Sequence, residues 1–159
     1  YNSDFIFIAG PNDPSIGNIL PLPPIFNYIV NDLKNKIPNI HFQTNPFRIR
    51  YCTQEIVIFR DNLLTKMKRN CVINPKIQNN TDLSHHLCKT ILDQSHLIPL
   101  PIQIKPIYWN YNHSLSLYPS PNIIILADNS DEFNWKYNDC NVVCPGQFSI
   151  NGSFVAYTP

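Results

Sequence analysis

The stretch Asn122-Ile123-Ile124-Ile125-Leu126-Ala127, followed at once by Asp128-Asn129-Ser130, decides the fold class of this chain. Its apolar run is far shorter than the roughly 20 residues that a membrane-spanning helix needs. A short, wholly apolar run of this kind is typical of a β-strand that is covered on both faces. Such strands occur in layered α/β proteins, so we predict a sheet with a buried strand over 122–127 and a polar loop directly after it.

Further strands and helices are predicted on both sides of this stretch. Apolar runs and alternation predict strands at 5–9, 41–44, 47–51 and 55–59, and the sheet is expected to finish with strands at 142–143 and 154–157. Apolar residues at helical spacing predict helices over 25–37, 63–67 and 83–92. Pro38 is expected to end the first helix, and Asp61 with Asn62 to cap the second. The chain therefore reads as one α/β unit.

Two proline-rich or polar segments interrupt this pattern. Residues 98–106 carry three prolines among apolar residues, which predicts an extended segment at a sheet edge. Residues 74–81 are polar and are expected to form a surface loop. The predicted strand at 5–9 lies so near Tyr1 that we expect it to pair with residues upstream, and the chain to be a fragment of a longer protein.

Composition limits the classes of function. The 159 residues carry a net charge of +1, which gives no electrostatic support for direct binding to nucleic acid or to an anionic membrane. With 4 glycines and no G-x-S-x-G or phosphate-cradling loop, dinucleotide-binding loops are excluded. The 5 cysteines form no tight framework and are expected to be free thiols.

Two loops after predicted strands carry candidate chemistry. In Gly10-Pro11-Asn12-Asp13 the carboxylate suits a metal ligand or a base, but Asp before Pro also favours a simple Asx turn. Asp128-Asn129-Ser130-Asp131-Glu132 offers three carboxylates, and oxygen-rich clusters hold magnesium or calcium. Its spacing does not match a calcium loop, so a solvated turn is the simpler interpretation.

Two other groups have a chemical interpretation and a plainer one. His85-His86-x-Cys88 with Cys140 and Cys144 is a conceivable zinc site only if the two pairs meet in space. The aromatic group Tyr108-Trp109-x-Tyr111 suits stacking on bases, but with little positive charge nearby it favours core packing or a protein contact.

Taken in order, several segments resemble the B-subunits of the replicative DNA polymerases. The resembling stretches include Gly10-Pro11-Asn12-Asp13-Pro14 with Ile19-Leu20-Pro21-Leu22-Pro23-Pro24, then Thr44-Asn45-Pro46-Phe47-Arg48-Ile49, and Pro145-Gly146-Gln147-Phe148-Ser149. Tyr51-Cys52-Thr53-Gln54-Glu55-Ile56-Val57-Ile58-Phe59-Arg60, Pro106-Ile107-Tyr108-Trp109 and the stretch 115–121 are similar to the epsilon branch in particular. The resemblance covers essentially the whole chain.

The resemblance implies a fold. Residues 1–159 would be the C-terminal half of a calcineurin-like metallophosphoesterase domain, an α/β two-sheet sandwich flanked by helices. The N-terminal part of that domain and an OB domain would lie outside this chain. The resemblance also implies loops that hold two metals in active members, and only the second half of those loops falls within this sequence.

At these metal loops the sequence departs from the active pattern. Pro11 and Asn12 stand where an Asn and a His ligand are expected, and Asp128 and Ser130 stand where two histidines are expected. The intermediate His corresponds to Arg60 or Asp61, and Arg is permanently charged. We therefore expect vestigial active-site loops with no metal, no cofactor and no catalytic residue, at Pro11, Asn12, Asp13, Asp128 and Ser130.

The function implied by the resemblance is that of a non-catalytic accessory subunit. It would bind the C-terminal, zinc-binding region of the catalytic subunit of DNA polymerase epsilon, and further replisome subunits, in the nucleus, with DNA contacted only through the complex. The alternatives are an active metal-dependent phosphodiesterase or nuclease of the same fold, and a stand-alone nucleic-acid-binding module. The residues expected to contact a partner are apolar and lie in predicted loops: Leu20, Leu22, Tyr108, Trp109 and Tyr111.

Overall fold

The computed structural model describes residues 3–15, 17–73 and 82–158. The chain begins with a strand–helix–strand unit, in which β1 (Phe5–Ile8) and β2 (Ile40–Gln43) pair in parallel. They are joined through α1 (Asn27–Lys36). The helix stops before Pro38 because the residue that precedes a proline is disfavoured in a helix. The first strand and the first helix are therefore confirmed.

The five-stranded sheet forms the centre of the molecule, with the strand order β3-β4-β5-β7-β6. Its strands are β3 (Phe47–Tyr51), β4 (Gln54–Phe59), β5 (Ile123–Leu126), β6 (Phe133–Tyr137) and β7 (Cys140–Cys144). Strand β5 lies in the middle and pairs in parallel with β4 and β7. The expected buried central strand and the α/β class are both confirmed.

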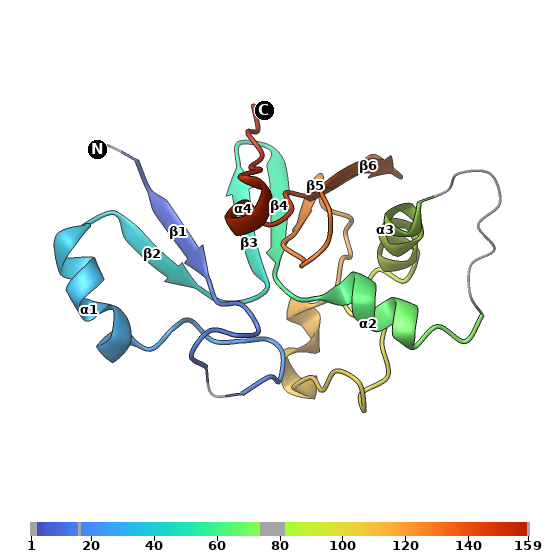
Figure 1. Cartoon of the computed structure of the whole chain (residues 1–159), viewed down its shortest axis with the longest axis horizontal. Helices are drawn as coiled ribbons and strands as arrows, with labels where there is room; N and C mark the ends of the chain where they lie inside the picture. The colour runs from blue at the N-terminus through green and yellow to red at the C-terminus, as the bar shows by residue number, and fades with distance from the viewer. Residues whose placement is uncertain (1–2, 16, 74–81, 159) are drawn as a thin grey trace.

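Four short helices connect or cover these strands. They are α2 (Leu63–Arg69), α3 (Leu83–Asp93), the 3-10 helix η1 (Trp109–Ser114) and α4 (Phe148–Asn151). In Figure 1 the two-stranded sheet with α1 lies on one side of the molecule and α2 with α3 on the other, with the five-stranded sheet between them. Among the described residues no helix is long and apolar enough to cross a membrane.

The core lies on the face of the five-stranded sheet toward α2 and α3. Because side chains alternate along a strand, every second residue of β4, β5 and β7 points into this layer. The helices add their apolar faces, and the loops around η1 close the cluster from one end. The buried residues of this core are Leu20, Leu22, Val57, Phe59, Leu63, Leu87, Cys88, Ile91, Leu92, Leu97, Ile98, Leu115, Leu117, Ile124, Leu126, Cys140 and Val142.

The C-terminal segment lies over the opposite face of the sheet. Ile56, Ile125 and Val143 on this face line a cavity of about 530 Å³ together with residues 153–157. The expected strand at 154–157 is wrong, because the described segment after α4 runs as coil over the sheet rather than along its edge. The sheet instead ends at β6, an edge strand next to β7 that the sequence does not predict.

Two other local expectations also need correction. Residues 98–106 do not form an extended edge strand, since Ile104 N donates to Pro101 O at 2.9 Å and bends the segment. The side chain of Asn62 makes no capping hydrogen bond at α2, although the helix starts where it was predicted. The expected surface loop at 74–81 lies outside the described residues.

Candidate functional site: charged loops at the strand ends

The loop after β1 is closed by the side chain of Asp13. Its Oδ2 accepts a hydrogen bond from Gly10 N at 2.7 Å, and Asp13 N donates to Gly10 O at 3.2 Å. Between them Pro11 is half-buried and Asn12 is exposed. The Asp13 carboxylate thus closes the turn, but by accepting from a residue three positions earlier, and not from the residue two positions later as an Asx turn requires.

The Arg60 guanidinium fills the space beside this loop. Its Nη1 donates to Ile8 O at 2.5 Å and contacts Asp13 Oδ2 at 3.2 Å. A Cβ placed on Gly10 would come within 2.7 Å of Arg60 Nη2, so the guanidinium packs directly against the glycine. Arg60 follows β4, and it therefore joins the carboxyl ends of β1 and β4 with a permanent positive charge.

Asn45 holds the backbone at the base of Arg60. It is fully buried, and its Nδ2 donates to Arg60 O at 2.7 Å while its Oδ1 accepts from Arg60 N at 3.0 Å. Its own backbone exchanges two hydrogen bonds with Leu22, at 2.8 and 2.9 Å. This one residue ties the proline-rich loop, the link between β2 and β3, and the end of β4 together.

The loop after β5 is organised by the buried carboxylate of Asp128. Its Oδ2 accepts from Leu64 N at 2.9 Å, and its Oδ1 accepts from Asn129 N at 2.5 Å. Asp128 therefore caps α2 from the end of the neighbouring strand β5, which replaces the cap expected from Asp61 and Asn62. Burial raises its pKa against the opposing effect of these backbone donors. Ser130 is half-buried, with its Oγ 3.5 Å from Cys144 Sγ.

A second buried carboxylate, Asp61, is held by two ammonium groups. Its Oδ1 accepts from Lys66 Nζ and from Asn62 N, the latter at 2.8 Å. Its Oδ2 lies 3.2 Å from Lys105 Nζ, as an ion pair without the alignment of a hydrogen bond. The side chain of Lys105 is only 5% exposed and that of Asp61 1%. Burial lowers the pKa of Lys105, and the Asp61 charge opposes that effect.

Lys105 is one of the residues of this site that sequence reasoning missed. It lies in a proline-rich segment and has no partner nearby in the sequence, so it reads as an ordinary exposed lysine. A lysine is rarely buried without a counter-charge, and only the fold brings Asp61 to it.

The carboxylates at these strand ends already have internal partners. Asp13 contacts Arg60, Asp61 contacts two lysines, and Asp128 accepts two backbone hydrogen bonds. In the part of the chain that the structure describes, no three His, Cys, Asp or Glu side chains come together as a metal site would require. These contacts of the three carboxylates hold the loops at the strand ends in place.

The residues considered for zinc lie in the packing around α3. The His85 ring stands edge-on to Trp135 with 5.1 Å between centroids, and Cys88 is fully buried in the core. Trp135 Nε1 donates to Ser84 Oγ at 2.8 Å. All five cysteines are free thiols, as the sequence predicted.

The predicted partner-contact residues separate into two groups. Leu20 and Leu22 are buried at 0% and 1% exposure, so neither can contact a partner from the folded surface. Their backbone bridges to Ile107 and Asn45 turn the two side chains into the core. Tyr108, Trp109 and Tyr111 are 46%, 68% and 57% exposed. We refer to these three side chains as the aromatic surface.

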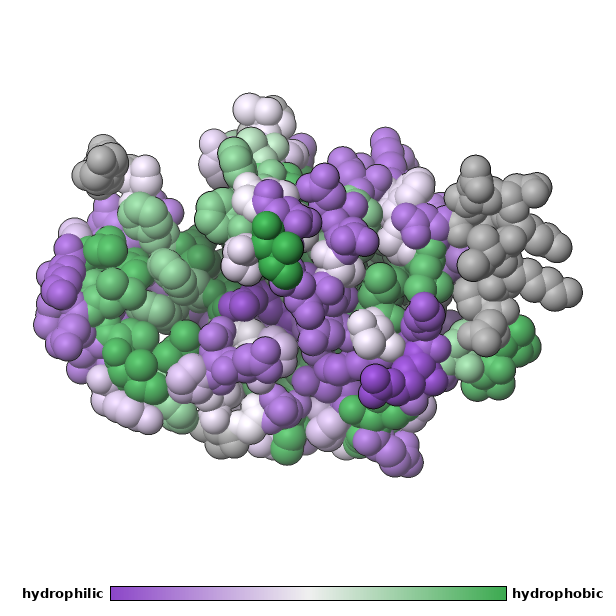
Figure 2. All heavy atoms as spheres, in the orientation of Figure 1, coloured by the Kyte–Doolittle hydropathy of each residue, from purple (hydrophilic) through white to green (hydrophobic). Residues whose placement is uncertain are grey.

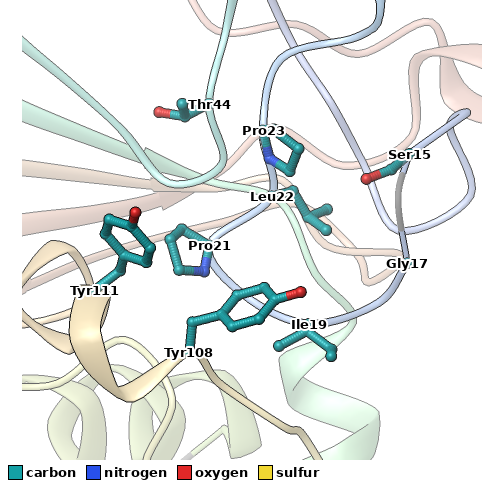
Figure 3. A pocket seen from close by; sticks show the side chains of 9 residues that line it. All are labelled: Ser15, Gly17, Ile19, Pro21, Leu22, Pro23, Thr44, Tyr108 and Tyr111. Atoms are coloured by element: carbon teal, nitrogen blue, oxygen red, sulfur yellow. The ribbon is translucent and has the colours of Figure 1, made fainter.

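A pocket of about 350 Å³ lies beside the aromatic surface. Figure 3 shows Tyr108 and Tyr111 around Pro21, with Ser15 and Thr44 farther along the wall. The lining carries no charged side chain, and Ser15 Oγ is buried without a hydrogen-bond partner among the described residues. Binding by this group stays a prediction; of its exposed members, Tyr108 and Tyr111 line the pocket and Trp109 does not.

Comparison with known proteins places this architecture in a family. A model of the family described as the B-subunit of DNA polymerases alpha and epsilon matches residues 1–134, and the chain belongs to that family. It is 44% identical, over 99% of its length, to DNA polymerase epsilon subunit 2 of Homo sapiens and to the DNA polymerase epsilon B-subunit of Arabidopsis thaliana. Identity to the epsilon B-subunit of Saccharomyces cerevisiae is 33% over 99% of the chain.

The similarity to epsilon members confirms the branch that the sequence motifs indicated. The chain spans about 30% of the length of these relatives.

Proposed function

We propose that the chain is part of a non-catalytic accessory subunit of DNA polymerase epsilon, working in the nucleus. It would hold the C-terminal, zinc-binding region of the catalytic subunit and join it to further replisome subunits, and would contact DNA only through the complex. The support is the identity of 44% to epsilon subunits across almost the whole chain. The fold we propose for the complete domain is the calcineurin-like two-sheet sandwich.

The observation that carries the non-catalytic part is the position of Arg60. Its guanidinium packs on Gly10 and contacts Asp13, in the loop where the family resemblance expects metal ligands. A fixed positive charge at this place opposes a divalent cation, and Pro11 offers no side-chain ligand. The substituted ligand positions and the Arg60 guanidinium both favour a structural role for the loop at residues 10–13 over metal binding.

The scaffold role is tested by co-expressing the full-length subunit with the C-terminal region of the epsilon catalytic subunit. We expect the two chains to co-purify in equal amounts after zinc loading. Failure of a folded, zinc-loaded partner to co-purify would contradict the proposed function.

The enzyme alternative has its own test. The purified full-length subunit is assayed for phosphodiesterase activity with manganese, beside an Asp13→Ala variant. We expect no activity from either protein. Activity that the substitution abolishes would overturn the non-catalytic proposal.

A further inference from the structure

The chain contains a single Asn-Gly step, Asn151-Gly152, and the structure places both residues in exposed positions. Asn151 is the last residue of α4, and Gly152 caps that helix in the left-handed conformation with φ 64°. A Cβ built on Gly152 would meet no atom within 4 Å. The backbone at this step is therefore open on the side where a side chain would stand.

An Asn-Gly step has a chemistry of its own. The backbone nitrogen of Gly152 can attack Cγ of Asn151, because glycine has no Cβ to hinder the approach. A bond forms between this nitrogen and Cγ, the bond from Cγ to Nδ2 breaks, and ammonia leaves with the amide proton. Water then opens the five-membered imide at either carbonyl, which leaves an aspartate or an isoaspartate in place of the asparagine.

The hydrogen bonds of α4 restrain this attack only weakly. Gly152 N donates to Phe148 O at 2.9 Å and must be freed from that bond before it reacts. The helix has 4 residues, and a single turn gains little from helical cooperativity. Its side chains Phe148 and Ile150 are 71% and 72% exposed, so packing does little to hold the turn closed. Local opening of the turn is therefore enough to release the Gly152 amide.

We propose that Asn151 is a site of spontaneous deamidation, and that the reaction loosens the C-terminal segment from the sheet. Both products weaken the cap of α4. Aspartate places a negative charge beside the carbonyl end of the turn, which is unfavourable. Isoaspartate adds a methylene group to the main chain, which moves Gly152 N away from Phe148 O.

The C-terminal segment begins directly after this cap. Ser153 Oγ donates to Pro145 O at 2.9 Å, and Tyr157 OH donates to Gln54 Oε1. Residues 154–156 lie between these two attachments and line the cavity over β4, β5 and β7. Because Ser153 follows the cap at once, a change at the cap acts first on its hydrogen bond to Pro145.

The test uses the full-length subunit, incubated at mildly alkaline pH, where the attacking nitrogen loses its proton more readily. Mass spectrometry of timed, digested samples measures the conversion of each asparagine from amide to acid, and enzymatic methylation of isoaspartate detects the isomer. Asn129 is the internal control, since it is also exposed but precedes Ser130, whose side chain hinders the same attack. The variants Gly152→Ala and Asn151→Gln are treated in the same way.

We expect Asn151 to convert several-fold faster than Asn129, and Gly152→Ala to slow this conversion several-fold. Asn151→Gln should show no conversion over the same period, because its longer side chain would have to close a larger ring. The deamidated protein, separated by its extra negative charge, should exchange the amides of residues 152–157 faster than the unmodified protein. The amides of β5 should exchange equally in both, since the sheet stays folded.

Conversion of Asn151 no faster than that of Asn129 would overturn the assignment of the site, as would an undiminished rate in Gly152→Ala. Equal amide exchange in the deamidated and unmodified proteins would overturn the effect on the C-terminal segment. Faster exchange throughout β5 would also contradict that effect, because the reaction would then destabilise the whole sheet.

Discussion

At the scale of single residues, charged side chains hold the loops at the strand ends in place. Asp128 directs its carboxylate to backbone donors of α2 and of its own loop, and Asp61 is neutralised by two lysines of the same chain. Both carboxylates are buried, which is unfavourable unless hydrogen bonds or opposite charges compensate. Two thiols, Cys88 and Cys140, are also buried in the core.

The ionisation of Asp128 predicts a pH dependence of stability. Burial raises its pKa above the ordinary value of 3.8, so between the two values the folded chain binds more protons than the unfolded chain. Wild-type stability should therefore fall, relative to Asp128→Asn, as pH rises from below 3.8 through the raised pKa of the folded state. Asn keeps an acceptor for Leu64 N and cannot ionise. Melting temperatures of both proteins across this range give the comparison, and an opposite or absent trend would contradict the assignment.

The buried thiols predict selective labelling. Burial raises the pKa of Cys88 to about 12 and that of Cys140 to about 11, whereas Cys52 and Cys71 are exposed. Because the thiolate is the reactive form, iodoacetamide at mildly alkaline pH should modify the exposed pair at least about 100-fold faster. Mass spectrometry of timed samples measures the rates. In denaturant all four should react alike, and fast native labelling of Cys88 would contradict the packing.

At the scale of elements, the fold depends on side chains that join segments far apart in the sequence. Asn45 connects the link between β2 and β3 to the end of β4 and to the proline-rich loop. At the other end of β4, Asn122 Oδ1 accepts from Glu55 N at 2.9 Å in an exposed setting. The two asparagines make the same kind of contact in opposite environments.

This pair predicts unequal losses of stability. Asn45→Ala removes two hydrogen bonds and leaves the backbone N–H and C=O of Arg60 without these partners. The free energy of unfolding should therefore fall by roughly 2–3 kcal/mol. Asn122→Ala, the matched control, should cost about 0.5–1 kcal/mol because water replaces the lost bond. Urea unfolding of both variants gives the free energies of unfolding. Equal losses of unfolding free energy in the two variants would contradict the structural role given to Asn45.

The elements predicted from sequence were those with a strong local pattern. The apolar run of β5 and the spacing in α1 and α3 identified them without tertiary information. Strand β6 was missed although Asn138 and Asp139, both with positive φ, form the two-residue turn that favours a hairpin with β7. The apolar residues at 154–157 predict a strand, but apolar residues alone do not distinguish pairing at an edge from packing on a face.

The candidate site was less predictable than the fold. The turn role of Asp13 follows from its own loop, but the contact of Lys105 with Asp61 joins residues 44 positions apart in a proline-rich context with no periodic signal. Likewise, the cap on α2 comes from Asp128 after a different strand. Long-range pairing of charges is set by topology, which the sequence pattern indicates only coarsely.

At the scale of the whole molecule, apolar side chains remain at the surface around the small sheet. Figure 2 shows them gathered over α1, β1 and β2. The exposed members include Phe5, Ile6, Phe7, Ile29 and Leu33. Contiguous apolar surface of this kind favours association, and β1 pairs with β2 alone among the described strands.

The isolated chain is therefore predicted to be poorly stable. Purified residues 1–159 should self-associate and bind a hydrophobic dye, because the uncovered apolar surface is not compensated. Sedimentation and thermal melting provide the measurement, with the full-length subunit as the control. Reversible, cooperative melting of the fragment as a monomer would contradict this expectation.

The proposed function requires that the subunit containing this chain form a stable, structural complex with the catalytic subunit of DNA polymerase epsilon. The most direct measurement is the dissociation rate of the full-length subunit from the C-terminal region of that catalytic chain, at about 0.1 M and about 1 M salt. We predict stable one-to-one association at both, since an apolar obligate interface is little screened. No association, or association lost at high salt, would contradict the account.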